Sequence, residues 1–227
     1  MSSAVEQILD HFRSRANPTN LAGMARYGIA TDQAFGVKMG DVKALVKQYR
    51  GDHQLAQELW ETGYREARLL AAQIADPKQV TPEMLDAWVA DFNSWDVCDT
   101  TCGKLFKKSP YAFDKALEWA RSDLEFTRRA GFALMAYLAL KSSKMADGEY
   151  ELFLLLIAEK ATDNRNLVKK AVNWALRQIG KRNRALNGRA IEVAEGILQT
   201  GDKTARWIAN DALRELRGDK VQERLKR

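Results

Sequence analysis

Apolar side chains recur along most of the chain at intervals of three and four residues, which is the spacing of one face of an α-helix. In the first segment, Val5, Ile8, Leu9 and Phe12 fall on a single stripe. Alternating β-branched segments are scarce, and only 4 of the 227 residues are proline. The pattern therefore predicts an all-α fold in which no strand is needed.

The same spacing predicts about a dozen helices joined by short connections. Thr81-Pro82-Glu83 is a good helix start, because threonine caps a helix well and proline fits the first helical position. Asn17-Pro18-Thr19 is expected to break the chain, with a short helix beginning at about Asn20. Residues 218–227 are charged and are expected to fray. The other predicted helices are Ser3–Arg15, Lys38–Arg50, Leu55–Thr62, Tyr64–Ala75, Met84–Phe92, Trp95–Lys107, Pro110–Arg121, Phe126–Lys141, Glu149–Thr162, Asn166–Lys181, Leu186–Gln199 and Lys203–Arg217.

Three late segments resemble one another and indicate an internal repeat. Ala171 follows Ala130 by 41 positions, and Ala209 follows Ala171 by 38, in similar surroundings. Periods near 40 with two helices each are typical of HEAT-type repeats, which stack into a curved solenoid. We therefore expect one repeat domain over residues 1–227 with a basic concave groove. The second helices of the repeats, expected to line that groove, carry Arg128, Arg129, Lys169, Lys170, Trp174, Arg177, Arg206 and Trp207.

Composition narrows the chemistry that the fold can carry. The net charge of +6 and a pI of about 9.3 are moderately basic, which suits nucleic acid without requiring it. His11 and His53 are the only histidines, and Cys98 and Cys102 have no further ligands nearby in the sequence, so a metal site or a Ser–His–Asp triad is not expected. No secretory signal or membrane span is recognisable, and a cytoplasmic protein without a cofactor is the default expectation.

The stretch from Ser94 to Cys102 is the strongest candidate for chemistry. Trp95 and Asp99 are four residues apart at the start of a predicted helix, so they share one face. Ser94 is a suitable N-cap, and Asp96 lies in the first turn, where the helix dipole favours an anion. A carboxylate beside a large aromatic ring must be solvated, paired, or placed for chemistry. Asp99 as a cap or an arginine partner, and Trp95 as packing between repeats, remain open at this point.

The chain resembles the AlkD-like DNA glycosylases, which are bacterial alkylpurine glycosylases built from HEAT-like repeats. The likeness covers nearly the whole chain. It rests on four segments: Met24-Ala25-Arg26-Tyr27, Ser94-Trp95-Asp96-Val97-Cys98-Asp99, Arg129-Ala130 and Lys170-Ala171-Val172-Asn173-Trp174-Ala175-Leu176-Arg177. The chain differs from the family pattern in having one tryptophan before Asp96 where two are expected, and Tyr137 where a lysine is expected.

The resemblance implies a role for each matching position. Trp95 and Trp174 would hold the sugar and backbone of the damaged nucleotide, and Asp99 would be the catalytic carboxylate. Arg129 would contact DNA near the lesion, and Arg177 would be a further basic contact. The remaining expected DNA contacts are Tyr27, Arg128 and Lys170.

The resemblance further implies hydrolysis of the N-glycosidic bond of N3- or N7-alkylated purines in duplex DNA. An alkylated purine is cationic and already a good leaving group, so a strong general acid is not required. One carboxylate can stabilise the developing oxocarbenium sugar and accept a proton from water, and aromatic faces add attraction. We expect a monofunctional, monomeric enzyme that leaves an abasic site without a tight base-flipping pocket.

A non-catalytic HEAT-like module that binds duplex DNA or a protein is the alternative. In that case Arg129 and Arg177 would be solvated surface residues or ion-pair partners within the repeats. Packing inside the protein is the expected role of the other tryptophans and of the two cysteines in either case. These residues are Trp60, Trp88, Trp119, Trp207, Cys98 and Cys102.

Overall fold

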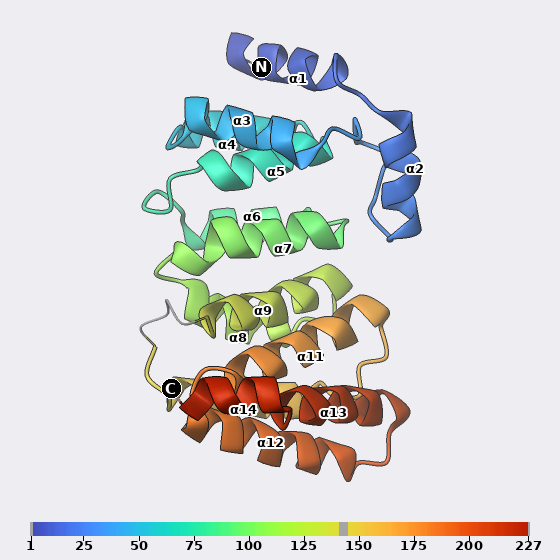
Figure 1. Ribbon diagram of the computed structural model, residues 1–227. Helices are drawn as coiled ribbons and strands as arrows, with labels where there is room; N and C mark the ends of the chain where they lie inside the picture. The colour runs from blue at the N-terminus through green and yellow to red at the C-terminus, as the bar shows by residue number, and fades with distance from the viewer. Residues whose placement is uncertain (1, 141–144, 227) are drawn as a thin grey trace. The chain divides into compact units, whose positions relative to one another are not determined.

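The computed structural model describes residues 2–140 and 145–226 (Figure 1). These residues form helices and contain no strand, which confirms the all-α prediction. The helices are α1 (Ser3–Arg13), α2 (Pro18–Arg26), α3 (Met39–Tyr49), α4 (His53–Glu61), α5 (Arg65–Ile74), α6 (Pro82–Ala90), α7 (Trp95–Lys104), the 3-10 helix η1 (Phe106–Lys108), α8 (Ala112–Ala120), α9 (Glu125–Leu138), α10 (Glu149–Glu159), α11 (Asn166–Gly180), α12 (Arg184–Leu198), α13 (Lys203–Leu216) and α14 (Asp219–Lys226).

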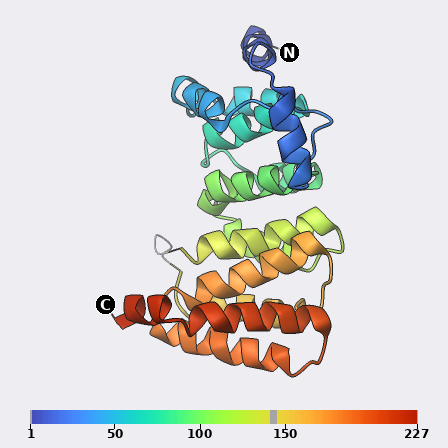
Figure 2. The same ribbon diagram turned by 45° about the vertical axis from the view of Figure 1, so that its right-hand side comes forward.

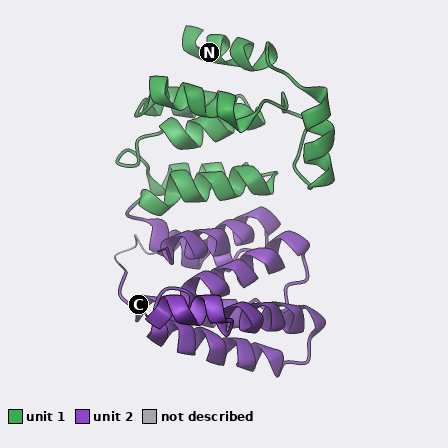
Figure 3. Cartoon of the chain, in the orientation of Figure 1, with its two compact units in different colours: residues 1–109 green, residues 110–227 purple. Residues whose placement is uncertain are grey.

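The chain divides into two compact units, residues 1–109 and 110–227 (Figure 3). Each unit has its own buried apolar core. The predicted single domain with a basic concave groove therefore stays a prediction, and the two units are described separately below.

In the second unit, helices pack in successive pairs. α8 packs on α9 and α12 on α13, while α11 lies between α9 and α13 and contacts both (Figures 1 and 2). Ala130, Ala171 and Ala209 occupy the repeated position on α9, α11 and α13, and all three are buried. Small residues at this position allow neighbouring helices to approach closely. The predicted repeat is therefore confirmed in this unit.

In the first unit, α5 lies between α3 and α7 and contacts both. The first residues of the three helices, Met39, Arg65 and Trp95, line one cleft. Residues near their C-terminal ends line a different pocket. The three helices therefore run in the same direction, and their two sets of ends form two separate surfaces of the unit. α2 runs across the direction of these helices (Figures 1 and 2).

Most of the predicted core residues are confirmed. Trp60 and Trp88 stack with ring centroids 3.9 Å apart, and both are buried, as is Trp119. Cys98 and Cys102 are also fully buried. The prediction for Trp207 was wrong, because its side chain is 43% exposed. The buried stripe of α13 runs through residues 205, 208, 209 and 212, and position 207 falls outside it.

Several helix boundaries differ from the prediction by up to three residues, and α2 and α7 show the local backbone chemistry responsible. α2 begins at Pro18 rather than at about Asn20, since Asn17 caps it by accepting a 3.1 Å hydrogen bond from the amide of Asn20. α7 ends at Lys104, and the predicted continuation to Lys107 is a separate turn of 3-10 helix. Lys141, the predicted end of the ninth helix, lies outside the described residues, and α9 itself ends at Leu138.

The C-terminal segment is a helix, not the frayed end that its charge suggested. Val221 is buried, and Gln222 donates a 2.6 Å hydrogen bond to the carbonyl oxygen of Leu216. The guanidinium of Arg224 donates to the carbonyl oxygen of Lys181. One apolar anchor and these tertiary hydrogen bonds hold residues 219–226 against the rest of the second unit.

Candidate nucleic-acid interface

The start of α7 is held by a buried ion pair. Asp96 accepts hydrogen bonds from Arg65, with distances of 2.7 Å from Nε and 2.5 Å from Nη2. The Ser94 hydroxyl donates to Asp96 at 2.6 Å and accepts from the amide of Ala30 at 3.3 Å. Ser94 is thus the N-cap residue by position, but its side chain does not cap the helix as expected. The role of Asp96 is therefore structural, because its carboxylate holds α7 against α5.

Glu66, the residue after Arg65, fixes the long connection before α3. Its fully buried carboxylate accepts hydrogen bonds from three consecutive amides, those of residues 35, 36 and 37, at 3.0 to 3.3 Å. It also pairs with Nη1 of Arg65 at 3.2 Å. Sequence reasoning missed both residues. The only sequence signal for these two residues is an Arg-Glu pair at the start of a helix. Because solvent-exposed helices commonly carry the same pair, this signal does not predict burial.

Trp95 is tied to the end of α2. Its indole Nε1 donates a 3.0 Å hydrogen bond to the carbonyl oxygen of Tyr27. The Tyr27 side chain is 79% exposed, whereas Trp95 is half-buried. Asp99 is one turn further along the face of α7 that carries Trp95, and it is also half-buried. The structure therefore brings together Trp95 and Tyr27, two of the predicted site residues, and Asp99 shares the helix face of Trp95.

An apolar cleft of about 490 Å³ opens beside Trp95. It lies at the N-terminal ends of α3, α5 and α7, which carry partial positive charge from unpaired amides. Such ends favour anions, including phosphate. The cleft is lined by Thr19, Asn20, Gly23, Met24, Tyr27, Ile29, Val37, Met39, Arg65 and Trp95.

The second unit carries the other predicted site residues on α9 and α11. Trp174 is half-buried and meets Tyr137 edge to face, with centroids 5.0 Å apart. Arg177 pairs with Glu215 at 2.6 Å and lies 3.8 Å from Asp211. Lys170 is exposed to solvent. The DNA contacts predicted for these residues stay predictions, and the ion pair within the repeats that was the alternative for Arg177 is present.

Arg128 and Arg129 are both buried, which a solvated surface arginine would not be. Arg129 donates a 2.7 Å hydrogen bond to the carbonyl oxygen of Leu167. Arg128 binds Asp163 at 2.6 Å and Asp123 at 3.0 Å. Burial opposes ionisation of Asp163, but hydrogen bonds from Arg165 and Arg128 outweigh it and lower the pKa of this carboxyl to about 2. Arg128 therefore has a structural role, whether or not it also contacts DNA.

Residues 2–140 and 145–226 contain no group of three or more His, Cys, Asp or Glu side chains arranged to hold a metal ion. Within the same ranges, none of the helices has both the length and the apolar character needed to span a bilayer.

Comparison with known sequences decides the family. A sequence model described as the DNA alkylation repair enzyme matches residues 8–216, which is most of the chain. The chain belongs to this family. Membership confirms the resemblance to AlkD-like proteins that the motifs around Trp95 and Trp174 indicated.

Two relatives and one solved structure are also similar to this chain. The chain is 22% identical over 196 residues to the uncharacterized protein Lin0241 of Listeria innocua, covering 85% of each sequence. It is also 22% identical over 133 residues to Lmo0209 of Listeria monocytogenes, covering 57% of this chain and 59% of that protein. One similar structure has a TM-score of 0.75 at 22% identity and covers 84% of this chain and 81% of the other. It is described as a new family of proteins related to the HEAT-like repeat DNA glycosylases with affinity for branched DNA structures. At this identity the likeness establishes the fold, a HEAT-like helical repeat.

Proposed function

We propose that this member of the DNA alkylation repair family is a DNA glycosylase. It hydrolyses the N-glycosidic bond of purines alkylated at N3 or N7 in duplex DNA and leaves an abasic site. Asp99 is the catalytic carboxylate, and Trp95 and Trp174 contact the sugar of the damaged nucleotide. Arg129, Arg177, Lys170, Tyr27 and Arg128 are the proposed DNA contacts.

The observation that carries the proposal is the different setting of two carboxylates on one helix. Asp96 is buried and neutralised by Arg65. Asp99 is half-buried, one turn from the Trp95 indole, on a helix whose first residue borders an open cleft. A partly exposed carboxylate beside an aromatic ring can approach a developing oxocarbenium ion and a water molecule. The family assignment and the positive helix ends at the cleft support DNA as the substrate.

The first test is release of N7-methylguanine and N3-methyladenine from methylated duplex DNA under single-turnover conditions. The Asp99→Asn substitution should slow release by about 100-fold or more, because one general base or charge stabiliser is removed. Asp114→Asn, which removes an exposed carboxylate on α8 far from any proposed site residue in sequence, is the control and should keep the wild-type rate of release. Full release by Asp99→Asn would exclude Asp99 as the catalytic group.

A second candidate function is recognition of branched DNA without base release. It is favoured by the description of the structural relative at TM-score 0.75. Under this alternative, the wild-type protein would release no base and would bind a four-way junction more tightly than a duplex of the same length. Parallel assays on methylated duplex and on an undamaged junction separate the two functions.

A further inference from the structure

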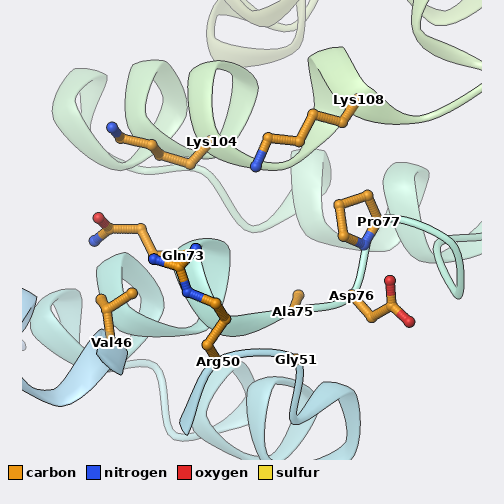
Figure 4. A pocket seen from close by; sticks show the side chains of 9 residues that line it. All are labelled: Val46, Arg50, Gly51, Gln73, Ala75, Asp76, Pro77, Lys104 and Lys108. Carbon is orange, nitrogen blue, oxygen red and sulfur yellow. The ribbon is translucent and has the colours of Figure 1, made fainter. Parts of the chain in front are cut away.

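A second pocket of the first unit lies at the opposite ends of α3, α5 and α7 from Trp95. It has a volume of about 460 Å³. Figure 4 shows its lining side chains, with α7 and η1 on one side and the ends of α3 and α5 on the other. The lining residues are Val46, Arg50, Gly51, Gln73, Ala75, Asp76, Pro77, Lys104 and Lys108.

Three cationic side chains surround this pocket without partners. Arg50, Lys104 and Lys108 form no ion pair and donate no side-chain hydrogen bond within residues 2–140 and 145–226. Arg50 and Lys108 extend from opposite sides into the space between them (Figure 4). By contrast, Arg65 at the other end of α5 is fully paired. Three unpaired cations around one cavity point to an anionic ligand.

Asp76 is the only carboxylate in the lining, and both of its oxygens accept hydrogen bonds from residues of its own turn. Its Oδ1 accepts a 3.0 Å hydrogen bond from the amide of Lys78, and its Oδ2 accepts one of 3.1 Å from Nε2 of Gln79. These bonds lower the pKa of Asp76, so it stays ionised, but it forms no ion pair with the three lining cations. The pocket therefore keeps an excess of positive charge.

The cations repel one another in the absence of a ligand. Partial burial lowers the pKa of Lys108, and the charges of Lys107, Lys104 and Arg50 lower it further. Cations near helix C-termini are stabilised by the helix dipole. That stabilisation explains a lysine at one helix end. It does not explain why Arg50 and Lys108 extend into the same open space and donate no hydrogen bond to the terminal carbonyls.

We propose that Arg50, Lys104 and Lys108 bind a backbone phosphate of the DNA duplex that contacts Trp95. The placement rests on the proposed function, because it takes Trp95 as a DNA contact. Lys104 is nine residues after Trp95 on α7, so the rise of the helix separates them by roughly 14 Å. Phosphates on one strand advance about 3.4 Å along the duplex axis for each base pair. With the duplex axis parallel to α7, the phosphate at this pocket belongs to a nucleotide about four base pairs from the one at Trp95.

The test compares two charge-matched double variants in binding to undamaged duplex DNA. Arg50→Gln with Lys108→Gln removes two lining cations. Lys43→Gln with Lys47→Gln removes two exposed cations of α3 that do not line the pocket. All four residues are exposed, so both proteins should fold, which circular dichroism will verify. Affinity is measured by fluorescence anisotropy over a series of salt concentrations.

The lining variant should bind about tenfold more weakly at low salt, and its log–log salt slope should be smaller by about 0.9, the contribution of one phosphate. The Lys43/Lys47 variant should keep the wild-type slope. Equal slopes for the two variants would overturn the proposal. The placement is tested separately on a duplex that carries one alkylated purine. Ending that duplex fewer than about four base pairs beyond the alkylated purine on both sides should abolish the difference between the two variants, and a difference that persists would overturn the placement.

Two further arms separate this inference from its alternatives. Titration with inorganic phosphate, followed by NMR of the lining residues, detects a site for a free anion. Phosphate binding combined with unchanged DNA affinity in the lining variant would assign the pocket to a free anion and reject the DNA contact. Base release is measured independently on methylated DNA. If no base is released while the lining variant shows the reduced slope, the glycosylase proposal fails and the phosphate site stands.

Discussion

The indole Nε1 of Trp95 donates a 3.0 Å hydrogen bond to the carbonyl oxygen of Tyr27, which lies 68 residues earlier in the chain. This bond joins the first residue of α7 to the C-cap of α2. It sets the rotation of the indole and keeps its ring at the border of the cleft. The exposed Tyr27 residue lines the same cleft, so this hydrogen bond joins the two elements that carry Trp95 and Tyr27.

Two substitutions of Trp95 distinguish the contribution of its hydrogen bond from the contribution of its aromatic ring. Trp95→Phe keeps a ring but removes the donor. The free energy of unfolding should fall by about 1 kcal/mol or less, because the freed carbonyl lies in an exposed segment and can bond to water. Trp95→Ala should reduce base release much more than Trp95→Phe. Urea unfolding and single-turnover release measure the two effects, and undiminished release by Trp95→Ala would remove Trp95 from the site.

The Arg65–Asp96 pair should be a major determinant of stability in the first unit. Both side chains are about nine-tenths buried, at 10% and 11% exposure. Arg65→Gln leaves the Asp96 carboxylate buried without its partner, and we expect a loss of about 3 kcal/mol in the free energy of unfolding. Arg13→Gln, which breaks the exposed pair with Asp10, is the control and should leave the urea midpoint nearly unchanged. Similar midpoints for the two variants would show that the buried pair is dispensable.

Acid should destabilise the second unit through Asp163. Its pKa is about 2 in the folded protein against 3.8 ordinarily, so the ionised form is the one that folding favours. The stabilisation is fully present above about pH 4 and is lost as the pH falls from about 4 to about 2, a change of about 2 kcal/mol. The difference in unfolding free energy between wild type and Asp163→Asn should shrink by that amount over this range. A difference independent of pH would contradict the assignment.

Replacing either of two glycines by alanine should change the stability of the protein, but in opposite directions. A Cβ at Gly131 on α9 would lie 2.4 Å from the backbone nitrogen of Ala120 on α8, so Gly131→Ala should force the two helices apart and cost about 1–3 kcal/mol. Gly188 on α12 has no atom within 4 Å of the corresponding position. Gly188→Ala should stabilise the protein by about 0.5–1 kcal/mol, because glycine is a poor helix former. Thermal unfolding of both variants checks the contrast.

The sequence alone determined the helical fold, the repeat and most of the core. These features depend on local periodicity, and each helix must bury its apolar stripe whichever neighbour covers it. Ala130, Ala171 and Ala209 were predictable for this reason, as was the burial of Trp60. The motif around Asp99 also indicated the family.

Only the tertiary structure decided which polar groups are paired. The ion pair of Arg65 with Asp96 spans 31 residues, and no sequence spacing predicts that Arg65 is the partner of Asp96. The exposure of Trp207 and the docking of α14 likewise depend on the neighbours that packing supplies. Periodicity specifies which face of a helix is apolar. The partner of a charge is fixed by the distance and direction between side chains, which exist only once the helices have packed.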